Sequence, residues 1–265
     1  MRVHERFHAV EFIMGTAISL DVVDPPDGSD ADEVNRAVFA WFTEVDERFS
    51  TFKADSEVSR LNRGEVAAAD VSADMRHVLD ACESLRQATF GYFDAYATGS
   101  LDPSGYVKGW SVQVASDRLL AAGLTNHCVN AGGDIRVRGV APNGEPWRIG
   151  IRHPWEKLKV AWVVAGDDLA IATSGTYERG FHVIDPFRGE PADELSSVTV
   201  IGGDLATADG YATAAVAMGK RAIDWLATLP DTSCAVITSD GSAYTSTGLP
   251  VVPPTASGEA DLPVY

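Results

Sequence analysis

Four short stretches of the sequence concentrate residue types that fold stability alone would not select. They are residues 102–110 (DPSGYVKGW), 172–176 (ATSGT), 182–189 (HVIDPFRG) and 207–214 (TADGYATA). Their carboxylates, hydroxyls, lysine and histidine are groups that bind hard metal ions, bind phosphates or move protons. Each stretch also has an ordinary structural explanation.

The stretch 207–214 offers oxygen ligands for a metal ion. In the first turns of a helix, Asp209 and Thr213 would be four residues apart and on the same face. A carboxylate, a hydroxyl and nearby carbonyl oxygens suit Mg²⁺, which takes few protein ligands together with water and substrate phosphates. The structural alternative is that Asp209 favours the helix dipole and Thr213 is merely tolerated.

The stretch 182–189 offers a proton acceptor. On a strand, His182 and Ile184 would face one side and their neighbours the other. A histidine with a pKa near neutrality is the usual base for activating a hydroxyl nucleophile. The alternative is a hydrogen-bonded structural histidine between apolar neighbours.

The other two stretches suit a phosphate. Residues 102–109 form a glycine-containing loop that leads into a helix predicted from about residue 109 to 121, where free N–H groups and Lys108 would attract an anion. Thr173, Ser174 and Gly175 follow an apolar strand and would cradle a phosphate or a ribose in the loop after it. An everyday Asp-Pro-Ser-Gly turn and a solvated turn remain the alternatives.

The elements that must position these residues follow from periodicity. Alternation over residues 7–23 predicts two strands joined by a tight turn at residues 14–16, and helical spacing predicts helices from residue 31 and over 75–85. Strands dominate from residue 128 to 202, followed by a helix over 206–218 and a hairpin over 234–246. This order predicts an α+β fold, in which early helices pack on antiparallel-rich sheets. We expect one domain over residues 1–250, with two intertwined subdomains as an alternative, and a flexible tail over 251–265.

The net charge of the chain limits the classes of partner that it can bind. The net charge is −17, and no basic cluster exceeds two residues. Nucleic acid and anionic membranes are therefore unfavourable partners. An acidic protein that handles an anion needs local positive charge, which a divalent cation would supply. The sequence contains no apolar run of about 18 residues that could span a membrane, and its first residues lack the pattern of a secretory signal. We therefore expect a cytoplasmic protein.

Taken together and in order, these stretches resemble the ApbE family, the FAD:protein FMN transferases. The series begins at residues 14–16 (MGT), continues through 50–62 (STFKADSEVSRLN), 91–94 (GYFD), 102–109 and 130–134 (NAGGD), and ends with 173–175, 182–189 and 208–213. Any one motif is unspecific, but eight in the family's order are not expected by chance.

The resemblance implies roles for particular residues. It implies FAD as substrate and Mg²⁺ as cofactor, with His182 as the base. Metal ligands would be the side chains of Asp209 and Thr213 and the backbone carbonyls of Gly105 and Ala212. The resemblance and the hydroxyl-rich stretch 173–175 together give the expected FAD-binding residues. They are Met14, Phe52, Tyr92, Phe93, Asp94, Asp102, Lys108, Thr173, Ser174, Gly175 and Ile184.

The reaction that the resemblance implies is attack of a Ser or Thr hydroxyl of an acceptor flavoprotein on the FMN phosphorus of FAD, with release of AMP. Two alternatives stay open: an FAD diphosphatase that uses water as acceptor, and a flavin-binding protein without turnover. The chain departs from the family in three respects. Phe52 stands where tyrosine is frequent, the segment 91–108 is short, and the signal peptide or lipoprotein cysteine of many relatives is not seen.

Overall fold

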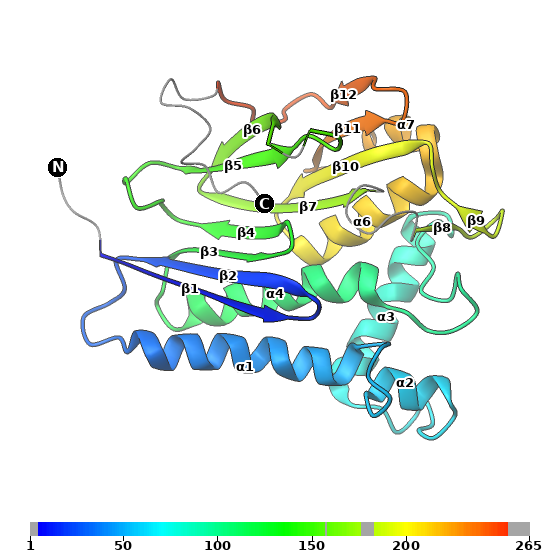
Figure 1. Cartoon of the computed structure of the whole chain (residues 1–265), viewed down its shortest axis with the longest axis horizontal. Coiled ribbons are helices and arrows are strands. Elements are labelled where there is room, and N and C mark those ends of the chain that lie inside the picture. The colour runs from blue at the N-terminus through cyan, green and yellow to red at the C-terminus, as the bar shows by residue number, and fades with distance from the viewer. Residues whose placement is uncertain (1–4, 157, 176–182, 254–265) are drawn as a thin grey trace.

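The computed structural model describes residues 5–156, 158–175 and 183–253. Its centre is an eight-stranded sheet in the order β1-β2-β3-β4-β7-β10-β11-β12, in which all paired neighbours are antiparallel (Figure 1). The strands are β1 (Arg6–Ile13), β2 (Thr16–Val23), β3 (Asn126–Ala131), β4 (Asp134–Arg138), β7 (Asp168–Gly175), β10 (Leu195–Gly202), β11 (Ser233–Thr238) and β12 (Ala243–Thr245).

Helices cover one face of this sheet and enclose the larger apolar core (Figure 1). They are α1 (Ala31–Phe49), α2 (Glu57–Asn62), α3 (Ala73–Ala88), α4 (Ser104–Ala121), α6 (Leu205–Met218), the 3-10 turn η1 (Gly219–Arg221) and α7 (Ala222–Leu226). The hairpin of β5 (Trp147–Arg152) and β6 (Val160–Gly166) packs on the other face and forms a second apolar core with it. A short hairpin, β8 (Ile184–Asp185) and β9 (Glu190–Pro191), projects beside α6.

Local sequence explains where the early helices begin and what they bury. The Asp30 side chain caps α1 by accepting from the N–H groups of Asp32 and Glu33, and Ser72 caps α3 at Met75. The apolar face of α1 is buried, and Trp41 donates from its indole nitrogen to the Ser111 carbonyl of α4 at 2.9 Å. α1 is thereby fixed to the helix that carries residues of the pocket described below.

The α+β fold class predicted from the sequence is confirmed, as are the first hairpin, with Met14 at a φ of 56°, and the helices from residues 31 and 75. The short helices α2 and α7 were not predicted. Residues 250–252 make backbone hydrogen bonds or bridges to β6. Residues 254–265 lie outside the described part of the chain, so the flexible tail stays a prediction.

Two expectations about the site were wrong. α4 begins at Ser104 rather than near residue 109, because the Asp102 carboxylate accepts from the Ser104 N–H at 3.0 Å and the helix continues through both Gly105 and Gly109. Residues 173–175 belong to β7 and not to a loop after it, because β10 continues the pairing as far as Ser197 opposite Gly175.

The crossing of α4 and α6 depends on glycine. A Cβ atom at Gly109 would lie 2.6 Å from both the Asp209 Cβ and the Leu205 carbonyl oxygen, and one at Gly105 would lie 3.0 Å from the Thr213 Cγ2. The two helices therefore approach to backbone contact distance only where α4 has no side chain. Within the described residues, the helices include none with the length and apolar character needed to cross a membrane.

Candidate active site

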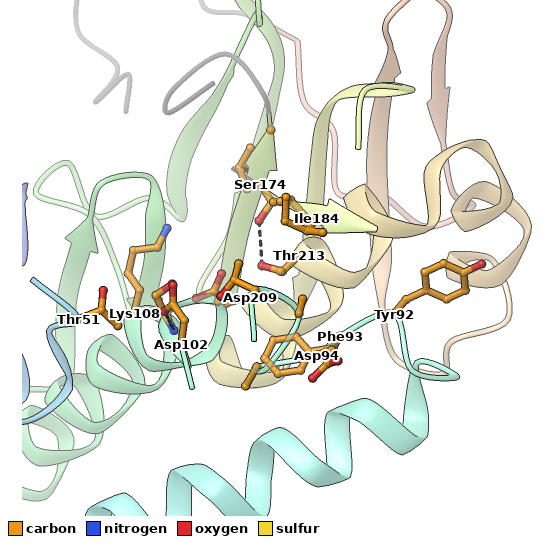
Figure 2. Close-up of a pocket in the computed structure, with 18 of the residues that line it drawn as sticks. Thr51, Tyr92, Phe93, Asp94, Asp102, Lys108, Ser174, Ile184, Asp209 and Thr213 are labelled. Carbon is orange, nitrogen blue, oxygen red and sulfur yellow. Dashed lines mark hydrogen bonds between the residues drawn. The ribbon is translucent and has the colours of Figure 1, made fainter. Parts of the chain in front are cut away.

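A cavity of about 440 Å³ opens where the beginning of α4, the middle of α6, the end of β7 and the loop after α3 meet (Figure 2). Among the described residues, its lining is Thr51, Phe52, Tyr92, Phe93, Asp94, Ala95, Ala97, Thr98, Asp102, Ser104, Gly105, Lys108, Thr173, Ser174, Gly175, Val183, Ile184, Asp209 and Thr213. These residues come from distant parts of the sequence, and the fold brings them together.

The loop between α3 and α4 is fixed by hydrogen bonds of Thr89 at its start and of Leu101 near its end. The Thr89 hydroxyl donates to the Leu85 carbonyl at 2.7 Å and accepts from the Phe93 N–H at 2.9 Å, which fixes Phe93 under the cavity. Asn62 of α2 exchanges two hydrogen bonds with the backbone of Leu101, at 2.8 and 2.9 Å. The loop that precedes α4, and with it Asp102, is thus tied to α2.

The floor of the cavity is the α4–α6 crossing. Asp209 and Thr213 lie one turn apart on α6, as the sequence spacing predicted, and Gly105 of α4 faces Thr213. Ser174 of β7 lies within reach of the same hydroxyl, with its Oγ 3.4 Å from the Thr213 Oγ1 (Figure 2). The floor therefore presents a carboxylate and two hydroxyls within one small region.

Asp209 is a buried carboxylate, with 2% of the residue exposed. Its Oδ2 accepts from the backbone N–H of Gly109 at 2.9 Å. Burial raises the pKa of Asp209 well above its usual range, and the neighbouring Asp134 carboxylate raises this pKa further, whereas Lys108 and the Gly109 hydrogen bond oppose the change. A cation beside Asp209 would offset this cost and keep the carboxylate ionised.

Lys108 lines the cavity and forms a buried ion pair. Its Nζ lies 2.7 Å from the Oδ2 of Asp134, which is fully buried, while the Lys108 side chain keeps 19% of its surface exposed. Asp134 is the first residue of β4, and its Oδ1 accepts a long 3.4 Å hydrogen bond from the Thr173 N–H. One ammonium group therefore stands near two buried carboxylates.

The mouth of the cavity is aromatic and open. Phe52 has 98% of its surface exposed. Tyr92 packs its ring edge-to-face against Phe187, with centroids 4.8 Å apart, and the Arg221 guanidinium lies 5.3 Å from the Tyr92 ring centroid. Ile184 of β8 also lines the cavity, beside Ser174 and Thr213 (Figure 2).

Most residues expected to act lie around this one cavity. The predicted residues that line it are Phe52, Tyr92, Phe93, Asp94, Asp102, Gly105, Lys108, Thr173, Ser174, Gly175, Ile184, Asp209 and Thr213. Met14, at the β1–β2 turn, and Ala212, fully buried in α6, are not among the described lining residues. His182 lies outside the described residues, so its role stays a prediction.

Sequence reasoning missed several lining residues, including Thr51, Ser104 and Val183. Each lies inside one of the motifs, next to a residue that was given a role, and that position was the available signal. It also gave no role to Asp134, although the residue ends the NAGGD motif. The pairing of Asp134 with Lys108 is a tertiary contact that spacing along the chain does not reveal.

The donors at the floor suit a hard cation better than a soft one. Within the described residues, no group of three or more His, Cys, Asp or Glu side chains has an arrangement that could hold a metal ion. A metal at Asp209 would therefore need hydroxyl and carbonyl oxygens, water or substrate phosphates to complete its coordination, as Mg²⁺ sites commonly do.

Comparison with known proteins supplies the family. The ApbE family model matches residues 14–99 and 97–237. The FAD:protein FMN transferase of Vibrio cholerae is 27% identical over 82% of this chain and 83% of that protein. The enzyme of the same name from Rhodobacter capsulatus is 30% identical over 80% of this chain and 39% of that protein. The solved structure of the flavin transferase ApbE from Vibrio cholerae has a TM-score of 0.84 at 26% identity, covering 94% of this chain and 100% of that one.

The fold, the pocket and these relatives define a transferase. The chain belongs to the ApbE family, whose model covers most of its length. The apbE protein of Thermotoga maritima shares the fold, with a TM-score of 0.82 at 22% identity.

Proposed function

We propose that this chain is a Mg²⁺-dependent FAD:protein FMN transferase, which cleaves FAD and attaches FMN to a Ser or Thr hydroxyl of an acceptor flavoprotein. The observation that carries the proposal is the single cavity in which the beginning of α4 and Lys108 lie beside the oxygen donors of Asp209 and Thr213. The Vibrio cholerae relative, a FAD:protein FMN transferase that aligns over most of both chains, supports the same reaction.

The floor fits a magnesium ion. Asp209 and Thr213 would supply side-chain oxygens, and Gly105 and Ala212 would supply carbonyls. In a helix, the Gly109 N–H would bond the Gly105 carbonyl, but here it also has the Asp209 Oδ2 as an acceptor at 2.9 Å. An N–H shared between two acceptors bonds each more weakly, which leaves the Gly105 carbonyl more available to a cation. Bound Mg²⁺ would neutralise charge on the pyrophosphate as its bridging bond breaks.

The remaining lining residues suit the two ends of a dinucleotide. The positive end of the α4 dipole borders the cavity at Ser104 and Gly105, and Lys108 adds a positive charge, so both favour the pyrophosphate. Phe52, Tyr92 and Phe93 offer aromatic surface for flat rings.

The acceptor hydroxyl must lose its proton as it attacks the phosphorus on the FMN side, and AMP leaves with the electrons of the broken P–O bond. The hydroxyl's pKa lies far above 7, so a base within about 2.6–3.2 Å is needed. We assign this role to His182 on the resemblance; the next residue along the chain, Val183, lines the cavity. Base catalysis of this kind is worth about 10²–10⁴-fold in rate, so His182→Ala should lose that factor and keep FAD binding.

The test separates transfer from hydrolysis. Purified protein is incubated with FAD and MgCl₂, with and without a flavoprotein substrate, and FMN and AMP are followed by chromatography. Transferase activity predicts AMP release that depends on the acceptor, with FMN found on protein. Rapid release of free FMN and AMP without acceptor would instead identify a diphosphatase, and bound but uncleaved FAD under every condition would identify a binding protein.

A further inference from the structure

The buried ion pair at the cavity floor has an arrangement that the proposed reaction does not by itself require. Two buried carboxylates, Asp134 and Asp209, lie close enough for each to influence the other, and one ammonium, that of Lys108, pairs with Asp134 and influences Asp209. Asp134 is not a lining residue among the described part of the chain, so it is not placed to touch a substrate.

The choice of partner for Lys108 has consequences for Asp209. Opposite charges in a poorly solvated interior attract strongly, so a lysine beside a buried carboxylate tends to pair with it. Pairing with Asp209 would occupy an oxygen that the proposed Mg²⁺ needs and would place a competing positive charge beside the metal. In the structure the Lys108 Nζ lies 2.7 Å from Asp134, while the Oδ2 of Asp209 accepts from the Gly109 N–H.

We propose that Asp134 is a positioning residue that holds Lys108 away from Asp209, so that Asp209 stays available to Mg²⁺ and Lys108 stays available to phosphate. This inference rests on the metal site of the proposed function. It assigns a role to the last residue of the NAGGD motif, which neither the cavity lining nor the reaction accounts for.

The surroundings of Asp134 favour this role over a general structural one. Its Oδ2 is buried and accepts no hydrogen bond of regular geometry among the described residues, so the ion pair is the main compensation for its burial. Its Oδ1 accepts the long 3.4 Å hydrogen bond from the Thr173 N–H, and the Asp134 carboxyl group also lies within hydrogen-bonding reach of the Asp209 side chain. If the role of this carboxylate were to stabilise the backbone of β4 and β7, both of its oxygens would be expected to accept hydrogen bonds from N–H groups at ordinary distances.

The experiment measures Mg²⁺ binding directly, by calorimetric titration of the full chain with MgCl₂ in the absence of FAD. Asp134→Asn keeps the shape of the side chain but releases Lys108 to Asp209, so we expect Mg²⁺ affinity to fall by roughly tenfold or more. Asp134→Asn combined with Lys108→Met should recover affinity to within about threefold of the wild type, because no ammonium remains to compete for Asp209.

Lys108→Met alone provides a second measurement that does not require Asp134→Asn to fold. It removes the ammonium that could compete for Asp209, so Mg²⁺ binding should be at least as tight as in the wild type. Asp240→Asn is the matched control, because it breaks the exposed Lys220–Asp240 pair of 2.6 Å at the surface and should leave Mg²⁺ affinity unchanged.

The outcomes separate this inference from the proposed function. A wild-type chain that binds no Mg²⁺ overturns the metal site and the inference with it. A wild-type chain that binds Mg²⁺ while Asp134→Asn binds it equally well overturns the inference alone, as does a double variant that stays as weak as Asp134→Asn, or a Lys108→Met variant that binds more weakly than the wild type.

Discussion

The floor and the mouth of the cavity are built in opposite ways. At the floor, Gly105 and Gly109 allow two helices to touch, and Asp209 is enclosed by them. At the mouth, Phe52 is almost fully exposed, and Tyr92 is half-buried, with contacts to the core and to Phe187. The floor is therefore part of the folded core, whereas the mouth has surface that the fold itself does not use.

Because of this difference, the floor and the mouth should contribute differently to the stability of the fold and to ligand binding. Floor residues take part in packing as well as in the proposed chemistry, so changing them alters stability, activity or both. An exposed aromatic side chain gains little from folding, and a bound ring that covers it would supply the missing burial. Substitutions at the two levels should therefore give different combinations of stability and ligand affinity.

The largest effect is expected for Asp209→Asn. The amide can still accept from the Gly109 N–H but is a poor magnesium ligand, so several kcal/mol of transition-state stabilisation, roughly a thousandfold in rate, should be lost. Stability should not fall, because the substitution removes a buried charge that burial disfavours. Rates of AMP release and urea denaturation check the two halves; a variant that keeps its activity would remove Asp209 from the metal site.

Next in size is the contrast between two phenylalanines that both line the cavity. Phe93 is 3% exposed, so Phe93→Ala should lower the free energy of unfolding by about 3–5 kcal/mol. Phe52→Ala serves as the matched control: it should change that free energy by less than about 0.5 kcal/mol while weakening FAD binding. Urea denaturation and flavin fluorescence measure both, and similar stability losses in the two variants would contradict the distinction between floor and mouth.

A smaller effect is expected from adding one methyl group at the helix crossing. A Cβ at Gly109 meets the Leu205 carbonyl, which is backbone and cannot turn aside, so Gly109→Ala should destabilise the fold by about 1–3 kcal/mol. Gly203→Ala places the same methyl group where nothing lies within 4 Å and should leave the melting temperature nearly unchanged or slightly higher. Equal melting temperatures for both variants would mean that the α4–α6 contact is not as tight as described.

Periodicity and motif order predicted much of this architecture. The helical spacing of apolar residues from residue 31 and over 75–85 is a local feature, so α1 and α3 could be predicted from local sequence. The start of α4 could not be predicted from local sequence, because the glycines at 105 and 109 weaken helix propensity. These glycines instead allow close contact with α6. Likewise, residues 173–175 resemble a turn in isolation and become strand because β10 pairs with them.

At the site, residue types at fixed spacing were enough to predict which side chains lie together when both are on one helix, as Asp209 and Thr213 are. They were not enough where the partner lies on another element, and Asp134 was therefore left without a role beside Lys108. Met14 and Ala212 show the converse, because motif order names them while the cavity lining among the described residues does not include them.

The central claim is transfer of FMN to protein, and mass spectrometry tests it most directly. The chain and its Asp209→Asn variant are expressed in separate cultures of the same cells together with candidate acceptor flavoproteins, and Ser and Thr residues are searched for a phosphoester-linked FMN. We expect the modification on an acceptor only in cells that make the wild-type chain. Free FMN and AMP produced from FAD by the purified chain, with no FMN found on any protein, would contradict the claim.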